Sequence, residues 1–590
     1  MTSRFGYCFH NRAMKLIEAL NILERVKQRK GESVTCFVAT GMNTLHLGTF
    51  LAAELGLIYS DRRTDIRHGL YGDFLGNLER LGGSESDCAV VLMEWPDLDP
   101  RLGLRTVCSW SPSTCNDIVS SVRKRTLRVR QTIEETCQRI PVVVCPPTLP
   151  IPPLSFVPGS QASSLEIDLH DLVQSFASDV SHSAQARLLS SQRLDMLSPL
   201  RERLDVKSEL LSGFPYKLGH ASALAGLIAR LAAAPVPKKG LITDLDDTLW
   251  RGILGEVGVQ GVSWDLDHHS QMHAFYQCFV NALSSEGVLL AVASKNEPEL
   301  VKQAFSRKDL ILTPNSVFPI EVGWKPKSES VTRILKTWNV GAESVVFIDD
   351  TAMELAEVKA AHPEIECVQF PTNDSAAVYE LVVRMRDLFG KRMILQEDSI
   401  RLDSIRHRQT NAASIEAAQA VPNSFLDQVE AEISFDFTKA PLDPRALELV
   451  NKTNQFNLNG RRYTQASWQK YLLDPSSFLA TVSYKDKFGP LGKIAVVAGR
   501  RSEKLNIDIW VMSCRAFSRR IEYRCLEELF AKFDVEEIEL DYLETERNQP
   551  LSQFLAEILG RAPFPHCDIS RQDVANRFAE IRRCQDMTNG

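Results

Sequence analysis

The stretch Lys238–Trp250, KKGLITDLDDTLW, constrains the fold of this 590-residue chain more than any other. Gly240–Thr243 is a short, β-prone apolar run, which is typical of a buried strand. Three carboxylates and a hydroxyl follow it directly: Asp244, Asp246, Asp247 and Thr248. An open α/β sheet places its chemistry at the C-terminal ends of its strands, where crowded carboxylates are costly unless a cation or a bound phosphate compensates. The stretch therefore predicts a functional strand end, and a polar turn is the simpler alternative.

A second and a third strand end repeat this arrangement later in the chain. Val288–Ala293 reads as a buried strand and leads into Ser294-Lys295-Asn296, where a small hydroxyl can donate to a phosphate oxygen. Ser344–Ile348 runs into the pair Asp349-Asp350, whose hard oxygen atoms suit magnesium.

A basic string lies between these two strand ends. Gly323–Ser328, GWKPKS, offers Lys325 and Lys327 as cations beside the carboxylates. Lys327 is favoured, because it opens the helix-like stretch Ser328–Lys336 and fits a W-x-x-K pattern.

In this order the four strings resemble the motifs of the haloacid dehalogenase (HAD) superfamily of phosphotransferases. The resemblance implies that Asp244 attacks phosphorus, that Asp246 acts as general acid and base, and that Ser294 and Lys327 assist. It also implies magnesium as cofactor, with Asp244, Asp246, Asp349 and Asp350 as the metal ligands. Thr248, Lys295 and Asn296 are expected near the substrate.

The spacing of the motifs leaves no room for a large cap domain over the site. Ser294 follows Asp244 by 50 positions, and Lys327 follows Ser294 by 33. Water exclusion must then come from the substrate or a partner, so we expect a site that admits a phosphate carried on something large.

Composition narrows the class of protein. The length suggests about three or four domains. A net charge of −7 argues against a nucleic-acid binder. The sequence contains no apolar run of about 18 residues, so we expect no membrane-spanning helix. Thirteen cysteines without C-x-x-C pairs, and no secretory signal, indicate reduced thiols and a cytoplasmic location.

Residues 1–235 predict a doubly wound α/β domain, with strands at Val34–Ala39, Cys88–Trp95 and Val142–Cys145. This region resembles the SGNH-hydrolase-like domain that precedes the HAD domain in long FkbH-type proteins. The resemblance is incomplete, because the turn that should hold a nucleophilic serine reads Thr40-Gly41-Met42-Asn43. His220 is either a remnant catalytic base or, more simply, a structural histidine. We expect a degenerate scaffold that binds rather than hydrolyses.

The rest of the chain divides into a HAD-like domain at 236–392, a charged helical linker at 393–424, a third domain at 425–560 and a tail at 561–590. The third domain is expected to hold strands, a helix and further strands, at Ala480–Tyr484, Lys493–Gly499, Leu505–Met512, Arg519–Phe533 (the helix) and Ile538–Tyr542. This order resembles an acyltransferase domain of the GNAT type. The phosphate-binding loop of that type has two glycines, which residues 515–520 lack, so ordinary acetyl-CoA chemistry is in doubt.

Two strings of the third domain match the C-terminal domain of FkbH-like proteins. Asn451–Asn457, NKTNQFN, makes Asn454 a candidate substrate contact, and Met512–Arg515, MSCR, makes Arg515 another. Cys514 is either a thiolate nucleophile activated by Arg515 and a helix start, or a small buried apolar residue; the residues favour neither.

The resemblance to FkbH-like proteins implies a multidomain α/β enzyme with two activities. It would capture the glyceryl phosphate unit of 1,3-bisphosphoglycerate on Cys514, remove the phosphate at Asp244, and deliver a glyceryl thioester to an acyl carrier protein for polyketide-type assembly. Two alternatives stay open: a magnesium-dependent phosphatase with flanking interaction domains, and an assembly protein that has lost turnover. The fourth motif departs from the usual D-D-N-P, since Thr351-Ala352 follows the paired acids.

Overall fold

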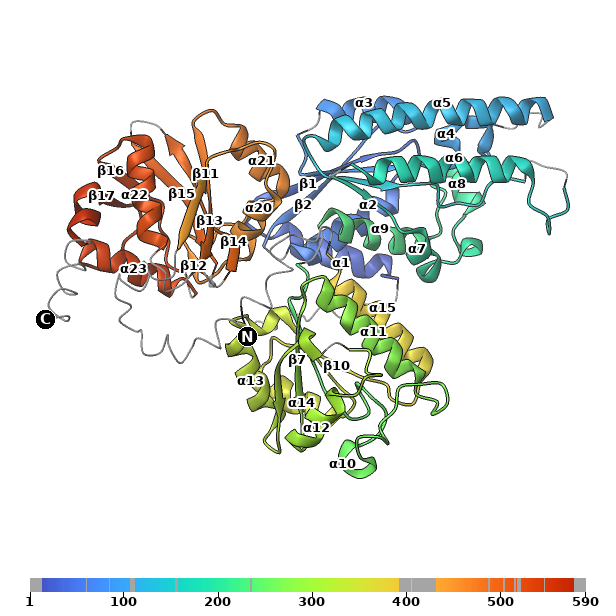
Figure 1. The fold of residues 1–590 in the computed structure, drawn as a ribbon. Coiled ribbons are helices and arrows are strands. Elements are labelled where there is room, and N and C mark those ends of the chain that lie inside the picture. Colours follow the sequence, from blue (N-terminus) through green and yellow to red (C-terminus); the bar gives the residue numbers. More distant parts are fainter. Residues whose placement is uncertain are drawn as a thin grey trace, which may run out of the picture. The chain divides into compact units, whose positions relative to one another are not determined.

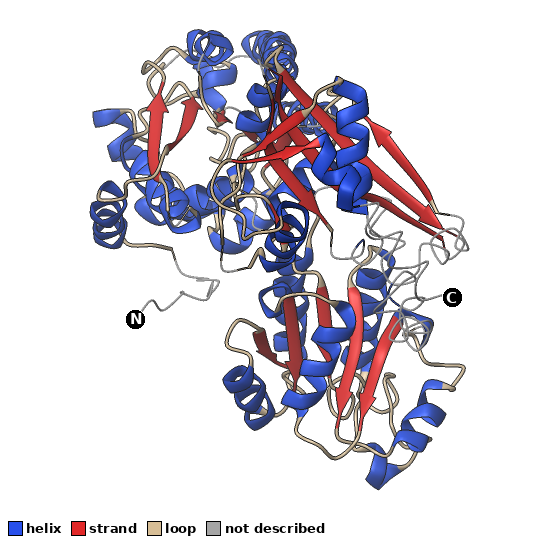
Figure 2. Ribbon diagram, turned by 90° about the vertical axis from the view of Figure 1, so that its left-hand side faces the viewer, coloured by secondary structure: helices blue, strands red, loops and turns tan. Residues whose placement is uncertain are grey.

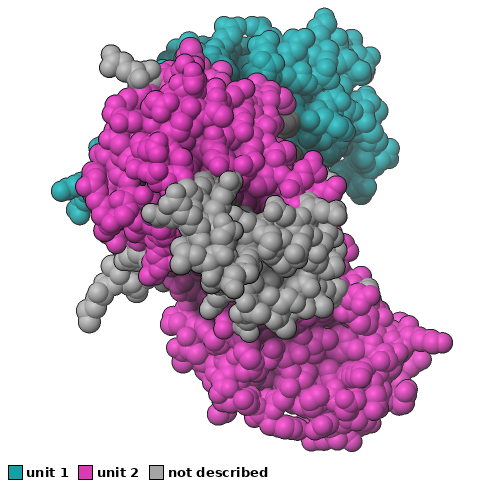
Figure 3. Space-filling model, turned by 60° about the vertical axis from the view of Figure 1, so that its left-hand side comes forward, with its two compact units in different colours: residues 1–235, 463–471 teal, residues 236–462, 472–590 magenta. Residues whose placement is uncertain are grey.

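The computed structural model describes most of the chain, and each statement about structure refers to this part: residues 13–59, 61–83, 85–106, 112–153, 157–183, 185–233, 236–312, 314–391, 405, 431–486, 489–501, 504–513, 516, 521–545 and 547–577. Cys514, Arg515 and nearly all of the predicted linker 393–424 lie outside it. The chain forms two compact units (Figure 3), one made of residues 1–235 and 463–471 and the other of 236–462 and 472–590. The predicted multidomain α/β class is confirmed.

The first unit is a three-layer domain around a five-stranded parallel sheet of order β2-β1-β3-β4-β5 (Figure 1). Residues of the central strands alternate between two cores: Val38 and Val90 face α1, α2 and α9, whereas Ala39 and Val91 face α3, α5 and α6. Such continuous apolar strands are typical of parallel sheets that are covered on both faces. The elements are α1 Leu16–Lys27, β1 Ser33–Ala39, α2 Leu45–Ile58, β2 Arg63–His68, α3 Phe74–Gly83, β3 Cys88–Leu92, α4 Trp95–Leu98, α5 Pro112–Cys137, β4 Val142–Cys145, α6 Ser164–Ser181, β5 Ala186–Leu188, α7 Ser191–Leu197, α8 Val206–Ser212 and α9 Leu218–Ala232.

The second unit holds a parallel sheet of order β10-β9-β6-β7-β8. The order reverses between β6 and β9, so the ends of these two strands form the topological switch point at which ligands bind in such sheets. Helices lie on both faces of the strands (Figure 2): α11, α12 and α15 contribute to one core, α13 and α14 to the other. The elements are β6 Gly240–Thr243, α10 Leu254–Val257, α11 Gln271–Ser285, β7 Leu289–Ser294, α12 Pro298–Phe305, β8 Val317–Val322, α13 Lys327–Trp338, β9 Val345–Asp349, α14 Ala352–Ala361, β10 Glu366–Gln369 and α15 Ser375–Phe389.

The second unit also contains a mixed sheet of order β11-β13-β14-β15-β16-β17, with β12 paired to β15. The strands expected at Ala480–Tyr484 and Lys493–Gly499 lie in β13 and β14, which pair antiparallel with Ala480 opposite Val497. β15 and β16 run parallel and are joined through α22, as the order of strand, helix and strand predicts. The elements are β11 Glu432–Asp436, α20 Pro444–Lys452, β12 Phe456–Asn457, α21 Gln465–Leu473, β13 Ser477–Asp486, β14 Gly489–Arg501, β15 Leu505–Met512, α22 Ile521–Phe533, β16 Glu537–Leu540, α23 Gln549–Leu559 and β17 Cys567–Ser570.

Two boundaries differ from the sequence-based domain limits. The sheet continues past residue 560, because β17 pairs antiparallel with β16 and buries Cys567 and Ile569 in the core, so the predicted tail 561–590 begins too early. Only these two apolar residues mark β17, too few for a strand pattern. Residues 463–471, predicted within the third domain, group with the first unit, where Gln469 Nε2 donates to the carbonyl of Gln138 at 2.7 Å.

Among the helices that the structure describes, none is both long enough and apolar enough to span a bilayer.

Candidate active site

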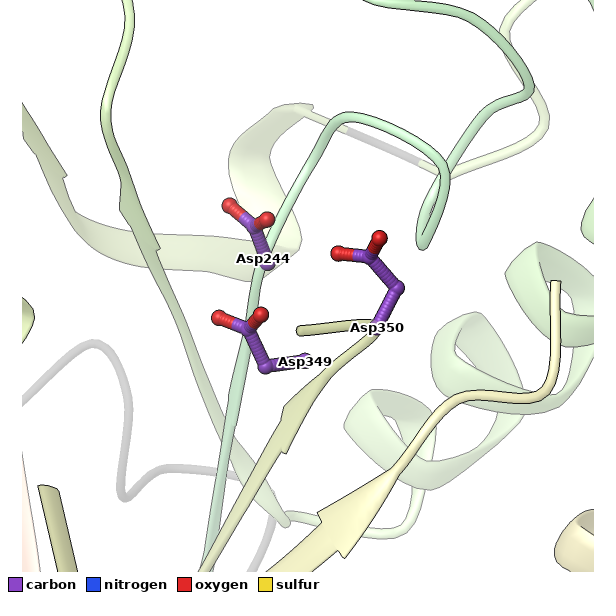
Figure 4. Close-up of side chains that lie close together, drawn as sticks. All are labelled: Asp244, Asp349 and Asp350. Atoms are coloured by element: carbon purple, nitrogen blue, oxygen red, sulfur yellow. The ribbon is translucent and has the colours of Figure 1, made fainter. Parts of the chain in front are cut away.

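The carboxylate cluster lies at the switch point of the parallel sheet in the second unit. Asp244 follows β6 directly, Asp349 is the last residue of β9, and Asp350 comes next (Figure 4). Oxygen atoms from these three side chains lie within 4.8 Å of one another. β6 and β9 are adjacent and parallel, and the amide of Asp244 donates to the carbonyl of Ile348 at 2.9 Å. Strand pairing therefore holds acids that are more than 100 positions apart in the sequence next to one another.

Lys327 is the cation of this cluster. Its Nζ lies 2.9 Å from Asp244 Oδ2 and 2.6 Å from Asp349 Oδ2, and all three side chains are buried. Burial by itself would lower the pKa of Lys327, but the two carboxylates outweigh burial and raise it. The preference for Lys327 over Lys325 agrees with this geometry, because the side chain of Lys325 is exposed.

One lysine does not neutralise three acids. Burial and repulsion from Asp244 raise the pKa of Asp349 and of Asp350 above the usual range. Asp244 Oδ1 is buried and accepts no hydrogen bond from any described residue. An unpartnered buried oxygen beside two further carboxylates is the donor set of a hard divalent cation, so these residues fit a magnesium ion.

The carboxylate of Asp246 accepts hydrogen bonds from residues outside this cluster. Its Oδ1 accepts from Trp250 Nε1 at 3.0 Å and its Oδ2 accepts from Asn296 Nδ2 at 3.0 Å. Burial raises the pKa of Asp246, although these hydrogen bonds oppose that shift. Its carboxylate is not part of the three-residue cluster, so the predicted ligand role of its side chain stays a prediction, whereas its place beside Asp244 suits an acid and base.

The polar residues at the end of β7 are linked to Asp246 by hydrogen bonds. Ser294 closes β7, and its Oγ accepts from Asn296 Nδ2 at 3.3 Å, so Asn296 joins Ser294 to Asp246. Lys295 does not reach the cluster by any described bond; its Nζ pairs with Glu354 Oε1 at 2.7 Å. Its expected substrate contact stays a prediction.

The loop after β6 owes its shape to Asp247. This residue has a φ of 49°, in the left-handed region that short polar side chains tolerate best, and its Oδ1 accepts from the amide of Gly252 at 2.8 Å. Thr248 follows with no exposed side-chain surface, and its hydroxyl has no hydrogen-bond partner among the described residues. Its expected substrate contact stays a prediction.

Sequence reasoning missed two groups that shape the site. The indole of Trp250 donates to Asp246, and the only signal in the sequence was the spacing of four residues between them. Thr372, in the loop after β10, donates from Oγ1 to the carbonyl of Asp247 at 3.0 Å, and no pattern in the sequence marks it.

Of the candidate site residues in the third domain, only Asn454 is among the described residues. Asn454 Oδ1 accepts from Arg462 Nη2 at 2.5 Å, so this side chain is engaged within its own segment. The predicted nucleophile Cys514 and its neighbour Arg515 lie outside the described residues.

The end of the string NKTNQFN and the two residues after it lie at a split in the mixed sheet. β15 and β16 pair only as far as Ile507 and Leu540. Beyond that point Asn459 Nδ2 bridges them by donating to the carbonyls of Asp508 at 2.9 Å and Asp541 at 3.1 Å.

In the first unit, His220 lies within a buried polar network. It is buried, its Nε2 lies 3.1 Å from Thr148 Oγ1, and its Nδ1 lies 3.0 Å from Ser198 Oγ. Burial, with Arg203 nearby, lowers its pKa to about 3. Thr148 in turn donates to the buried carboxylate of Glu94 at 2.5 Å, so the ring belongs to a closed polar network.

Among the comparisons with known proteins, one with a solved structure agrees with the fold. No protein-family model matches the sequence, and no curated protein matches it. Among solved structures, the N-terminal part of the protein BF1531 from Bacteroides fragilis, which contains a phosphatase domain complexed with Mg, aligns with a TM-score of 0.51 and 20% identity over 63% of this chain and 98% of that one. At this identity the likeness shows a shared fold.

A second solved structure, an uncharacterized protein from Corynebacterium glutamicum, aligns over 26% of this chain and 98% of its own, at 16% identity and a TM-score of 0.19. This score is too low to support an argument about fold. The HAD, SGNH, GNAT and FkbH-like assignments therefore rest on the motifs described above.

Proposed function

We propose that this chain is a magnesium-dependent phosphatase that forms a phosphoryl intermediate on Asp244. The observation that carries the proposal is the state of Asp244: one oxygen is fixed by Lys327, and the other is buried, unpartnered and next to Asp349 and Asp350. The Mg-bound phosphatase domain in BF1531, which shares the fold, supports the choice of metal. Magnesium held by Asp244, Asp349 and Asp350 would neutralise charge on the phosphoryl group during transfer.

The side chains divide the reaction between them. An oxygen of Asp244 bonds to phosphorus while the bond from phosphorus to the ester oxygen breaks, and Asp246 gives its proton to that leaving oxygen. Asp246 then takes a proton from water as the water oxygen attacks phosphorus, which releases phosphate and restores Asp244. Lys327 and the hydroxyl of Ser294 are placed to stabilise charge on the phosphoryl oxygens.

The finer form of the proposal names the substrate. The thiolate of Cys514 attacks the acyl phosphate of 1,3-bisphosphoglycerate, a carbon–sulfur bond forms, and phosphate leaves. The remaining phosphate ester is hydrolysed at Asp244, and the glyceryl group passes to an acyl carrier protein. Support comes from the NKTNQFN and MSCR strings, which resemble FkbH-like proteins, and from a site whose described residues 236–391 include no cap domain.

Intact-protein mass spectrometry after incubation with 1,3-bisphosphoglycerate and magnesium tests both levels. We expect a glyceryl adduct on the wild type, a phosphoglyceryl adduct on Asp244→Asn, and no adduct on Cys514→Ala. If no protein carries an adduct while the wild type still releases phosphate from simple esters, the transfer step is wrong and the phosphatase stands. If the wild type also releases no phosphate, the phosphatase proposal fails and a non-catalytic assembly role takes its place.

A further inference from the structure

One fully buried side chain holds the acid and base of the proposed reaction. Trp250 has no exposed surface, and its indole Nε1 donates to Asp246 Oδ1 at 3.0 Å. The ring belongs to the core of the domain, where it packs edge-on against Phe305 with 6.0 Å between the ring centroids. A side chain in a close-packed core cannot turn without displacing its neighbours. The donor is therefore fixed in space before a substrate binds.

The backbone brings the indole to the carboxylate. Trp250 lies four residues after Asp246, and the two residues form an isolated β-bridge. The amide of Trp250 donates to the carbonyl of Leu245 at 3.2 Å, so the chain turns back on itself directly after β6. The turn is anchored from the core, because the buried side chain of Gln277 on α11 donates to the carbonyl of Leu249 at 2.9 Å.

A second donor reaches the same carboxylate from the neighbouring strand end. Asn296, which follows β7 and is buried, donates from Nδ2 to Asp246 Oδ2 at 3.0 Å. Trp250 and Asn296 thus hold one oxygen each. An indole N–H and an amide NH₂ group donate but do not accept, so neither donor can take a proton from Asp246. The carboxylate is held at both oxygens without competition for its proton.

We propose that Trp250 is a positioning residue that orients Asp246 for proton transfer to the leaving oxygen. The inference rests on the proposed function, because it concerns the acid and base of that reaction. Without the indole bond, the carboxylate loses the donor at Oδ1 and can rotate away from the ester oxygen. The loss matters most for an ester whose leaving oxygen is strongly basic, since that oxygen needs the proton as its bond to phosphorus breaks. Trp250 thereby adapts the site to alkyl phosphates.

The test compares two esters of similar size, p-nitrophenyl phosphate and 2-phenylethyl phosphate, with the full-length protein and magnesium. Nitrophenolate leaves with little help, whereas the alkoxide must be protonated as it leaves. We expect Trp250→Phe to lower kcat/KM by about tenfold or more for the phenylethyl ester, and by less than about threefold for the nitrophenyl ester. A purely structural role would lower both values by the same factor.

Trp264→Phe is the matched control. The indole of Trp264 lies in the same core and also donates one hydrogen bond, to the carbonyl of Asp309 at 3.0 Å. This variant loses the same type of donor without a change at Asp246, so both esters should keep their wild-type kcat/KM. Thermal unfolding shows whether each variant is folded at the assay temperature. If Trp250→Phe is not, 3-benzothienylalanine at position 250 keeps the bicyclic shape, lacks the N–H, and should give the same selective loss.

A double-mutant cycle shows whether the effect passes through Asp246. In Asp246→Asn the side chain still accepts from the indole but has no acid proton to give. Adding Trp250→Phe to this variant should change kcat/KM for the phenylethyl ester by less than about twofold, because two residues that act through one group are not additive.

The outcomes separate this inference from the proposed function. If the wild type hydrolyses neither ester, the phosphatase proposal itself fails. If the wild type hydrolyses them and the loss of the indole N–H lowers both values equally, or leaves both unchanged, the positioning role is overturned. An undiminished effect of Trp250→Phe in the Asp246→Asn background would also overturn it, because the indole would then act through another group.

Discussion

At the scale of single residues, the buried ion pairs of Lys327 dominate the site. This lysine lies between two carboxylates that the paired strands β6 and β9 bring together. Lys327 thus has a structural role in addition to any catalytic role. The two roles can be measured separately, because magnesium can replace the positive charge of Lys327 but not its hydrogen bonds.

Replacing Lys327 by methionine tests this double duty. Without metal, the variant keeps two buried acids without their cation, so we expect a loss of about 3–5 kcal/mol in the free energy of unfolding of this domain. Added magnesium should raise its melting temperature more than that of the wild type. The measurement is thermal unfolding at several magnesium concentrations, and equal shifts in both proteins would contradict the argument.

Asp244 and Asp247 allow a matched comparison of two neighbouring acids. Asp244→Asn removes the nucleophile, so we expect kcat for a simple phosphate ester to fall by roughly a thousandfold or more. Asp247→Asn keeps both the hydrogen-bond acceptor for Gly252 and the tolerance for its positive φ, and it should keep kcat within about threefold. Similar losses in both variants would place Asp247 in the chemistry.

At the scale of elements, the strands of the two parallel sheets that the sequence predicts are those with apolar side chains on both faces. β1, β3, β4, β6, β7 and β9 all follow this rule. β2, with the sequence RTDIRH, does not: it lies at the edge of the first sheet and is recruited by its backbone pairing with β1. Edge pairing depends on a partner distant in sequence, which a local pattern does not contain.

The same distinction explains what could be predicted of the site. Carboxylates that follow an apolar run are visible in the local sequence, so Asp244 and Asp349 could be assigned from their motifs. Lys327 could be assigned from the W-x-x-K pattern before a helix-like stretch. The contact of Thr372 with the carbonyl of Asp247 spans 125 positions and uses a backbone oxygen, which every residue has. The bridge made by Asn459 is invisible for the same reason.

That bridge gives a prediction for the mixed sheet. Asn459→Ala removes both donors that join the carbonyls of Asp508 and Asp541, and two acceptors lose their partner. We expect a loss of about 1–3 kcal/mol, seen as faster amide exchange in 505–512 and 537–543 by mass spectrometry. Asn454→Ala, which removes a local bond to Arg462, is the control and should leave exchange in β15 unchanged.

The first unit carries its own pH dependence. Burial, with repulsion from Glu94, raises the pKa of Asp97 to about 7, although hydrogen bonds from the amides of Glu94 and Gly41 oppose the shift. A carboxyl whose pKa is higher in the folded state adds stability that is complete below its unfolded pKa, near 4, and is lost as the pH rises through 7. Amide exchange in 88–98 should therefore accelerate between pH 5 and pH 8, after correction for the intrinsic rate. Asp97→Asn should flatten this trend, and a trend unchanged in the variant would contradict it.

At the scale of the whole molecule, the polar centres of the first and second sheets differ in what they leave unsatisfied. In the first unit, Glu94 accepts hydrogen bonds from Thr148, Leu149 and Tyr216, so both of its carboxylate oxygens have partners. In the second unit, the carboxylate oxygen Asp244 Oδ1 has no such partner among the described residues. Similar parallel sheets thus carry a closed network around Glu94 in one case and an open acceptor at Asp244 in the other.

Metal removal should therefore affect one part of the chain. Chelation with EDTA should abolish phosphate release and lower the melting temperature of the second unit, because a ligand that binds only the folded state stabilises it. Amide exchange in β1, β3 and β4 should not change. Faster exchange in these strands after chelation would show that metal occupancy reaches the first unit.

The grouping of residues 463–471 with the first unit has a consequence for synthesis on the ribosome. Residues 1–235 emerge first, but the segment that completes their unit follows about 230 positions later. At roughly 5–20 residues per second, the nascent first unit waits some tens of seconds for it. During that interval the surface around Asp87 and Gln138, which Thr464 and Gln469 later contact, is open to chaperones. A release of the nascent chain before residue 471 would leave this unit unfinished, however well its own sheet has folded.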